Sequence, residues 1–439
     1  MSNSNILATR KGRFASFGIL YITEGIPLGF TATAMAAYMR TQGISAAEIG
    51  SFIAILYLPW AFKWAWAPLV DLVTLRRFGG RKAWIMGCQI LMIITLMSFA
   101  FIDMGNAMSM MILVAFVHNF FSSLQDVAID SLAVSTLEKE ELGRANGFMF
   151  GGAYLGQALG GSGALFLSAQ FGFMATFPYV AALLIAVAIF ITRRLQDPMC
   201  AEDAEENIVT DVMAQMITKI KGFLSELYIG FFKSGKGPKV GVAFALLPAG
   251  ALALSTVTGS TLQVDLGMSQ SDIAEISMYT GVLSAFGCVL GGWMGDKIGQ
   301  RKHIAIWYFF SSLPVFYLAW LLKGQTGVGD LTIAQYYPAA IAAALFTGLF
   351  YGVGSAVFMG LTNPLVAATQ FTGYMALKNV AHSYSNYWQG SAVDQYGYST
   401  VMFIDGMIVL LPILILPFMV PRSKTKSTET ADSPVPAAV

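Results

Sequence analysis

Charged residues are scarce in this chain: Asp, Glu, Lys and Arg together make up 12% of its 439 residues. A soluble protein carries about 25% charged residues. Hydrophobic residues reach 56%, and the mean hydropathy is +0.63. The net charge of +1 gives no sign of a nucleic-acid partner. These values predict a membrane protein with several spans and the lipid bilayer as a partner.

Cysteines are also few, and the spacing of Cys88, Cys200 and Cys288 fits neither a metal site nor a disulfide framework. The sequence has no phosphate-binding loop, catalytic triad or metal-ligand cluster. We therefore expect no cofactor, no metal and no enzymatic activity, which argues against an ATPase or a membrane enzyme.

Long apolar runs are what the chain does have. A membrane-spanning helix needs about 20 mostly apolar residues. Twelve stretches meet this length: 14–39, 49–70, 83–103, 108–135, 144–169, 174–193, 240–264, 273–296, 302–322, 332–360, 368–393 and 399–420. The first stretch follows basic residues and lacks a small-residue cleavage site, so we expect an uncleaved first span.

The longest gap between these stretches lies in the middle of the set. It predicts six helices in 1–193, a cytoplasmic linker at 194–239, six helices in 240–420 and a tail at 421–439. In the linker, apolar residues recur at three- and four-residue steps, which predicts an amphipathic helix. That helix either lies on the inner membrane face or packs on the other helices. The tail is rich in Ser, Thr and Pro, and we expect it to be disordered.

Basic residues are divided unevenly between the two sides of the membrane. If the N-terminus is inside, nearly all Lys and Arg residues outside the apolar stretches fall on that side. The opposite loops hold only Arg40 and Lys323. Because cytoplasmic loops carry the excess of Lys and Arg, we expect both termini to be cytoplasmic.

The two halves of the chain repeat each other. Gly43-Ile-Ser-Ala-Ala-Glu-Ile49 matches Gly267-Met-Ser-Gln-Ser-Asp-Ile273, and Phe171-Gly-Phe173 matches Tyr396-Gly-Tyr398 at almost the same offset. Internal repeats are typical of transporters, which place the substrate site at the repeat interface near the bilayer midplane.

A glycine-rich basic loop follows the stretch 273–296. It resembles the loop signature of the major facilitator superfamily, and the matching residues are Gly291, Gly295, Asp296, Gly299 and Arg301. Asp71 and Arg81 belong to a looser copy in the first half. The resemblance implies an all-α membrane protein with twelve transmembrane helices in two pseudo-symmetric six-helix bundles, and a motif that latches one conformation at the cytoplasmic side. The alternative is that the basic residues only set the topology.

A closer resemblance covers the first half. The phrases Glu24-Gly-Ile-Pro-Leu-Gly29, Phe62-Lys-Trp-Ala-Trp-Ala-Pro-Leu-Val-Asp71 and Ser123-Leu-Gln-Asp-Val-Ala-Ile-Asp130 are similar to those of the bacterial muropeptide permeases. Relatives of that family include siderophore permeases and acetyl-coenzyme A transporters. The resemblance implies secondary transport across the bacterial inner membrane.

Ionisable residues occur inside the apolar stretches, where such residues are usually functional. At about 1.5 Å per residue, Glu24, Asp126 and Lys378 each lie about 15 Å from the inner end of their stretch, near the midplane of a ~30 Å core. Lys63 is a little shallower, and Asp130 lies nearer the cytoplasmic interface. Because a lone buried charge is costly, we expect these groups to pair or to face water.

Asp126 is the candidate for proton coupling. Burial raises the pKa of a carboxyl group and a nearby lysine lowers it, so a carboxyl that moves between these settings binds and releases a proton. The alternative is a static salt bridge to Lys63 or Lys378. For Asp130 we favour a passive role, because an acid near the interface can stay solvated. The resembling permeases often have a small residue in place of Glu24, and this departure implies a substrate different from theirs or a second proton site.

The stretch 368–393 is unusually polar, and Lys378, His382 and Asn386 share one of its helical faces. A cation with amides suits an anionic, hydrogen-bonding substrate, although such residues also join neighbouring helices. We expect a monomeric transporter whose partners are protons and a small-molecule solute such as an anhydro-muropeptide. A siderophore or another large acidic solute is the alternative within transport, and a membrane sensor that does not transport is the alternative of another class.

Overall fold

The computed structural model of the protein describes residues 5–103, 106–138, 141–197, 211–248, 253–324 and 327–420. Every regular element in these ranges is a helix, so the predicted all-α class is confirmed. The predicted disordered tail at 421–439 and the linker residues 198–210 lie outside the described part of the chain.

The helices of the first half follow the predicted apolar stretches. α1 (Arg10–Gly29) continues through a π-helical turn at Phe30–Met35 into α2 (Ala36–Thr41). The others are α3 (Ala46–Ala61), α4 (Lys63–Leu72), α5 (Arg81–Ser98), α6 (Met108–Thr136), α7 (Leu142–Ala158), α8 (Ala164–Phe171) and α9 (Thr176–Arg194). Ser45 begins α3 with a capping box. The Ser45 side chain accepts a hydrogen bond from the Glu48 N–H, and the Glu48 side chain accepts one from the Ser45 N–H.

The helices of the second half are α10 (Val212–Tyr228), α11 (Lys236–Leu246), α12 (Val257–Asp265), α13 (Gln270–Ile298), α14 (Gln300–Leu321), α15 (Ile333–Met359) and α16 (Ala367–Ile415). Ser269 and Asp272 begin α13 with the same capping box as α3, so the sequence repeat is also a structural repeat. α16 is broken at Gly397, whose φ of 75° and ψ of 168° suit glycine. This break separates the two apolar stretches predicted in the region.

Eight of the described helices are long and apolar enough to cross a membrane, or nine if α3 and α4, which are bent by 46°, form one span. The remaining predicted stretches coincide with interrupted helices: α7 with α8, α11 with α12, and the two parts of α16. The chain is therefore a multi-pass membrane protein. The count of twelve spans stays a prediction, because it depends on how the interrupted helices are divided.

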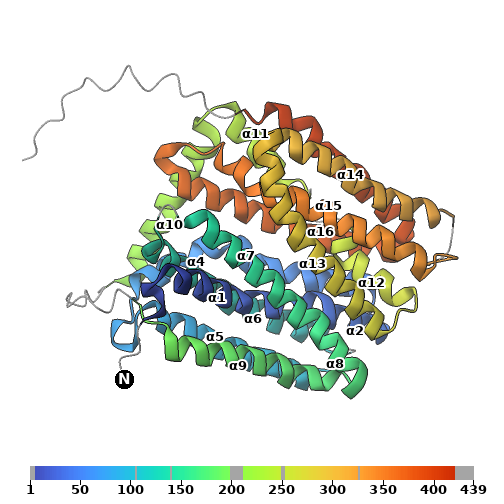
Figure 1. Cartoon of the computed structure of the whole chain (residues 1–439), viewed down its shortest axis with the longest axis horizontal. Helices are drawn as coiled ribbons and strands as arrows, with labels where there is room; N and C mark the ends of the chain where they lie inside the picture. The colour runs from blue at the N-terminus through green and yellow to red at the C-terminus, as the bar shows by residue number, and fades with distance from the viewer. Residues whose placement is uncertain are drawn as a thin grey trace, which may run out of the picture.

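The helices lie side by side along the long axis of the molecule (Figure 1). Those of the first half fill the lower part of this view, and α14, α15 and α16 fill the upper part. α1 packs along α7, and α13 packs along α15. The two halves meet where α3 packs on α16 and where α7 and α8 pack on α13.

Polar contacts tie the halves together at the end of the molecule that holds Arg40, which we call the Arg40 end. The Arg40 guanidinium makes two 2.7 Å contacts with the Asp265 carboxylate of α12, which also accepts a 2.6 Å hydrogen bond from Tyr398. Asp394 of α16 accepts hydrogen bonds of 3.2 and 2.8 Å from the first two N–H groups of α3. There its charge faces the positive end of the helix dipole.

The linker helix α10 joins the halves at the opposite end (Figure 1). Its Lys219 lies 3.4 Å from Asp71 of α4. Arg81 begins the next helix along the chain, α5, and we call this the Arg81 end. Its Phe223 ring stacks on Trp64 of α4, with centroids 5.3 Å apart and planes 5° apart. Its Glu226 accepts a 2.5 Å hydrogen bond from Thr369 of α16. One face of the linker helix therefore packs on α4 and α16.

Glycines let α1 and α7 touch backbone to backbone. A Cβ atom added to Gly25 would lie 2.0 Å from the Ala153 carbonyl oxygen, and one added to Gly160 would lie 2.0 Å from the Ile26 carbonyl oxygen. A side chain at either position would push the helices apart, as at other small-residue interfaces in membranes.

Gly151 and Gly152 give a matched test of this packing. A Cβ atom at Gly152 would lie 2.1 Å from the Gly18 carbonyl oxygen, whereas Gly151 has nothing within 4 Å. We expect Gly152→Ala to destabilise the protein by about 1–3 kcal/mol, the usual cost of overpacking, and Gly151→Ala to leave stability unchanged. Thermal unfolding of both variants in detergent measures the difference, and equal melting temperatures would contradict the packing argument.

Candidate functional site

Lys63 stands at the bend between α3 and α4. Its ammonium nitrogen lies 2.6 Å from an Asp126 carboxylate oxygen and 3.4 Å from one of Asp130. Both acids project from one face of α6, because residues four apart on a helix are neighbours. Asp126 is 2% exposed, whereas 41% of the Asp130 side chain is exposed. Asp126 is thus the more enclosed of the two acids.

Glu24 of α1 completes the group, and we call Glu24, Lys63, Asp126 and Asp130 the acid cluster. The Glu24 carboxyl group lies near that of Asp126, and its Oε1 atom has no hydrogen-bond partner among the described residues. The cluster thus brings three acids and one base together.

Tyr21 is a member of this site that sequence reasoning missed. Its hydroxyl donates a 2.7 Å hydrogen bond to Asp130. The signal was present in the sequence, since Tyr21 lies three residues before Glu24 and therefore on the same face of α1.

Gln125, the first residue of the Gln-Asp phrase, holds α1, α5 and α6 together. Its amide nitrogen donates to the Gln89 side chain at 2.5 Å and to the Ile85 carbonyl oxygen at 2.9 Å. Its amide oxygen accepts from Thr23 at 3.0 Å. In the Gln-Asp phrase, Gln125 therefore holds neighbouring helices together, and the next residue, Asp126, is the enclosed acid.

Lys378 of α16 has a different environment. Its ammonium nitrogen lies 4.5 Å from the centre of the Tyr351 ring, and no carboxylate among the described residues forms a salt bridge with it. It also lines a pocket between α11, α14, α15 and α16. The sequence offered Lys63 or Lys378 as the partner of Asp126. In the structure Asp126 pairs with Lys63, whereas Lys378 contacts the Tyr351 ring.

The other predicted residues of α16 occupy two surroundings. His382, one turn after Lys378, stacks on Tyr57 of α3, with centroids 5.2 Å apart and planes 17° apart. Asn386 is 1% exposed, accepts from the Val257 N–H at 3.0 Å and donates to the His382 carbonyl oxygen at 2.9 Å. Asn386 therefore joins α16 to the start of α12. This is the helix-joining role that the sequence left open as the alternative to solute binding.

Asp405 is another residue that sequence reasoning missed, after Tyr21. It is fully buried and accepts hydrogen bonds from the Ala253 N–H at 2.8 Å and from Gln389 at 2.7 Å. The rule that identified Asp126 applies here too, because Asp405 lies within the apolar stretch 399–420. Its bonds hold the segment that precedes α12.

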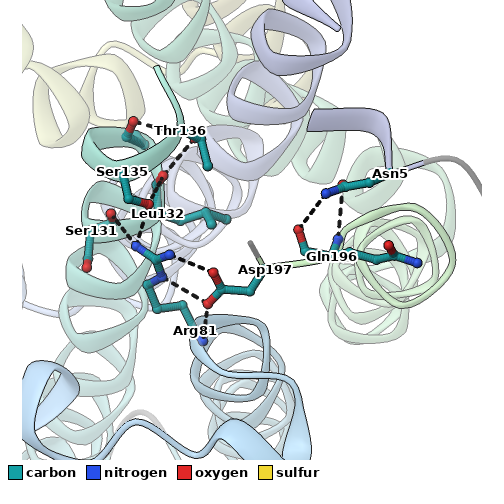
Figure 2. Close-up of polar contacts among 9 residues, drawn as sticks. Asn5, Arg81, Ser131, Leu132, Ser135, Thr136, Gln196 and Asp197 are labelled. Carbon is teal, nitrogen blue, oxygen red and sulfur yellow. Dashed lines mark hydrogen bonds and ion pairs between the residues drawn. The ribbon is translucent and has the colours of Figure 1, made fainter. Parts of the chain in front are cut away.

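Arg81 of the looser motif has its partners within the first half. Figure 2 shows its guanidinium against the Asp197 carboxylate, with contacts of 2.6 and 2.9 Å. It also donates to the Ser131 carbonyl oxygen at 2.7 Å and to the Ser135 hydroxyl at 2.5 Å. Arg81 thus ties α5, α6 and the end of α9 together.

Asp71 does not join Arg81. Its side chain is 54% exposed and lies 3.4 Å from the Lys219 ammonium of α10. The two residues of the looser motif therefore have separate partners, and Asp71 contacts the linker helix.

The glycines of the second-half motif let α13 pack closely on α15 and end α13 in a turn. Cβ atoms added to Gly291 and Gly295 would lie 2.2 and 2.6 Å from atoms of α15. Gly299 ends α13 with a φ of 93°, and Arg301 donates to a carbonyl oxygen after α16 at 3.3 Å. The side chain of Asp296 lies outside the described residues.

An ion pair fixes the loop before α7 to the start of α1. Arg13 donates to the Glu141 carboxylate at 2.8 and 2.5 Å. This guanidinium holds the pKa of Glu141 below its usual range. The pair adds a polar tie to the glycine contacts between α1 and α7.

Comparison with known proteins identifies the family. The sequence model of the Major Facilitator Superfamily matches residues 17–328, which is most of the chain. The chain belongs to the major facilitator superfamily. It is therefore a secondary transporter of small-molecule solutes and not an enzyme.

Individual relatives of this superfamily member support the resemblance to muropeptide permeases. The anhydromuropeptide permease of Escherichia coli (strain K12) is 26% identical over 444 residues, covering 99% of this chain and 84% of the permease. The putative transporter AmpG 4 of Rickettsia conorii is 26% identical over 407 residues, covering 91% of this chain and 94% of the relative. The solved inward-open xylose transporter XylE from E. coli has a TM-score of 0.71 at 12% identity, covering 95% and 98% of the two chains, and shows the shared fold.

Asp197 gives a stability test away from the acid cluster. Removing one partner of a buried ion pair leaves the other charge uncompensated, so we expect Asp197→Asn to lower the free energy of unfolding by about 3–5 kcal/mol. The double variant Arg81→Met, Asp197→Leu should recover most of the loss, because neither buried charge remains. Thermal unfolding of the variants in detergent measures both effects. A wild-type melting temperature for Asp197→Asn would show that the pair does not stabilise the protein.

Proposed function

We propose that this transporter takes up a bulky, polar and partly anionic solute together with protons across the bacterial inner membrane. The acid cluster carries the proposal, because three carboxyl groups and one ammonium group are packed between α1, α4 and α6. Ionisable groups within membrane spans mark proton relays and substrate paths. A cluster with more acids than bases can gain or lose a proton while Lys63 keeps a partner.

Asp126 exchanges the coupling proton in this proposal. It contacts Lys63 at 2.6 Å and lies near Glu24 of α1. An ionised Asp126 accepts from Lys63, whereas a protonated Asp126 donates to Glu24 and loosens from the ammonium. Asp130 then remains as the second partner of Lys63. Protonation therefore alters the contacts between α1, α4 and α6.

We further propose the twelve-helix arrangement in two six-helix bundles, at 1–193 and 240–420. This count takes α7 with α8 and α11 with α12 as interrupted spans and divides α16 at Gly397. The basic linker and Arg81 support a cytoplasmic Arg81 end, with both termini on that side. The Arg40 end then faces outward, and its polar ties close the protein to the outside.

The solute that we favour is an anhydromuropeptide. The anhydromuropeptide permease of E. coli and the putative transporter AmpG 4 of Rickettsia conorii are relatives of this chain. Lys378 offers a cation that no described carboxylate neutralises. A siderophore or another large acidic solute would use the same cation. A membrane sensor that binds the solute without moving it is the alternative of another class.

Asp126→Asn tests the coupling in proteoliposomes. We expect the variant to lose the accumulation of labelled anhydromuropeptide that an inward proton gradient drives, because position 126 no longer titrates. Counterflow exchange at equal pH should persist, because exchange needs no net proton movement. Asp330→Asn, in the exposed loop before α15, is the matched control and should accumulate solute like the wild type.

Two outcomes would overturn parts of the proposal. If Asp126→Asn accumulates solute with the wild-type pH dependence, Asp126 does not couple proton movement to transport. If the wild type binds the solute but neither accumulates nor exchanges it, the protein is a sensor.

A further inference from the structure

We propose that a ring of three tyrosines and Lys378 is the solute site and that it selects saccharides with a free carboxylate, either on the sugar or on a peptide joined to it. The ring consists of Tyr57, Tyr154, Tyr351 and Lys378, and we call it the tyrosine collar. The inference rests on the proposed function and divides the work: the acid cluster binds protons, and the collar binds the solute.

The collar draws its members from both halves of the chain. Tyr57 lies on α3 and stacks on His382 of α16. Tyr154 lies on α7, and its hydroxyl accepts from the Cys288 thiol of α13 at 3.8 Å. Tyr351 lies on α15, which packs along α13, and its ring contacts Lys378, one turn before His382 on α16. A solute in the collar therefore touches both halves.

Lys378 is held at the collar by an aromatic face. Its ammonium nitrogen lies 4.5 Å from the centre of the Tyr351 ring. Such a contact attracts a cation less strongly than a hydrogen-bonded carboxylate does, so a solute carboxylate can replace the ring as partner. Gly354 of α15 leaves room beside the ammonium, because an added Cβ atom would lie 3.9 Å from it.

A small aromatic pocket, with room for little more than a water molecule, adjoins the ammonium group of Lys378. Its walls include Phe244 of α11, Tyr308 of α14, and Phe350 and Phe358 of α15. Ligand sites are commonly lined by apolar and aromatic side chains, with a few polar groups that fix the orientation of the ligand. Lys378 and the tyrosine hydroxyls are those polar groups here.

A carboxylated sugar matches the chemistry of this surface. The C–H faces of a sugar ring are apolar and can lie on aromatic rings, while its hydroxyl and acetamido groups exchange hydrogen bonds with tyrosine hydroxyls. A carboxylate on the sugar, or on a peptide joined to it, pairs with Lys378. A neutral sugar lacks the ion pair and a linear peptide lacks the stacking face, so each should bind more weakly.

Cys288 supplies a reporter inside the collar. A full-length protein with Cys88→Ala and Cys200→Ser keeps Cys288 as its single cysteine. The probes are N-acetylglucosaminyl-1,6-anhydro-N-acetylmuramic acid and its methyl ester, which keeps both rings but loses the charge. We expect the acid to protect Cys288 from N-ethylmaleimide at about tenfold lower concentration than the ester, because only the acid forms a charge-assisted contact with Lys378.

Three variants in the same background separate the parts of the collar. Lys378→Met should make acid and ester equivalent, and Tyr351→Leu should weaken protection by both. Tyr387→Leu is the matched control, since Tyr387 lies on the same helix as Lys378 but is 58% exposed; it should behave like the parent. Labelling rates without probe normalise each variant. Equal protection by acid and ester in the parent, or parent-like protection of Tyr351→Leu, would overturn the collar.

Asp126→Asn in this background separates the two proposals. We expect the acid to protect Cys288 in this variant as in the parent, although proton-driven accumulation is lost. Protection without proton-driven accumulation in the parent would overturn the coupling and leave the collar standing. Proton-driven accumulation without protection would overturn the collar and leave the coupling standing.

Discussion

Lys63 carries the single ammonium group of the acid cluster, 2.6 Å from Asp126 and 3.4 Å from Asp130. Inside a membrane span, a charge without a partner is very costly. The helices that carry these residues are therefore held in one arrangement by charge as well as by packing. Removing Lys63 would leave the carboxylates of the cluster without a compensating charge, whereas moving a proton shifts the pairing within the cluster. This difference makes the cluster suitable for coupling.

Close backbone contacts link the cluster to the second half of the chain. A Cβ atom at Gly50 of α3 would lie 2.5 Å from the Asn386 carbonyl oxygen, and one at Gly390 of α16 would lie 2.3 Å from the Ala46 carbonyl oxygen. α3 thus lies directly against the helix that carries Lys378, and it ends at the bend where Lys63 begins α4. We infer that a shift of α3 along α16 would move the acid cluster and the collar together.

Features that depend on neighbouring residues could be predicted from the sequence. The apolar stretches became helices, and the four-residue spacing placed Asp126 and Asp130 on one face of α6. The choice between Lys63 and Lys378 as the partner of Asp126 needed the bend between α3 and α4, which an apolar run of residues does not reveal. The same holds for the π-helical turns and the break at Gly397.

Contacts between distant residues were beyond the sequence patterns. Arg81 and Asp197 are 116 positions apart, and Asp405 and Ala253 are 152 positions apart. Neither pair shares a helix face or a periodic pattern, so only the folded arrangement brings them together. The motif glycines were recognised as a signature, but their close contacts with α15 required the structure.

Counting protons at the moment of solute binding tests the coupling most directly. Purified transporter in weakly buffered detergent solution is mixed with saturating N-acetylglucosaminyl-1,6-anhydro-N-acetylmuramic acid at matched pH, and the pH change is recorded. We expect the wild type to take up protons from the solution and Asp126→Asn to take up none. Solute binding without proton uptake by the wild type, or the same uptake by Asp126→Asn, would contradict a coupling role for the acid cluster.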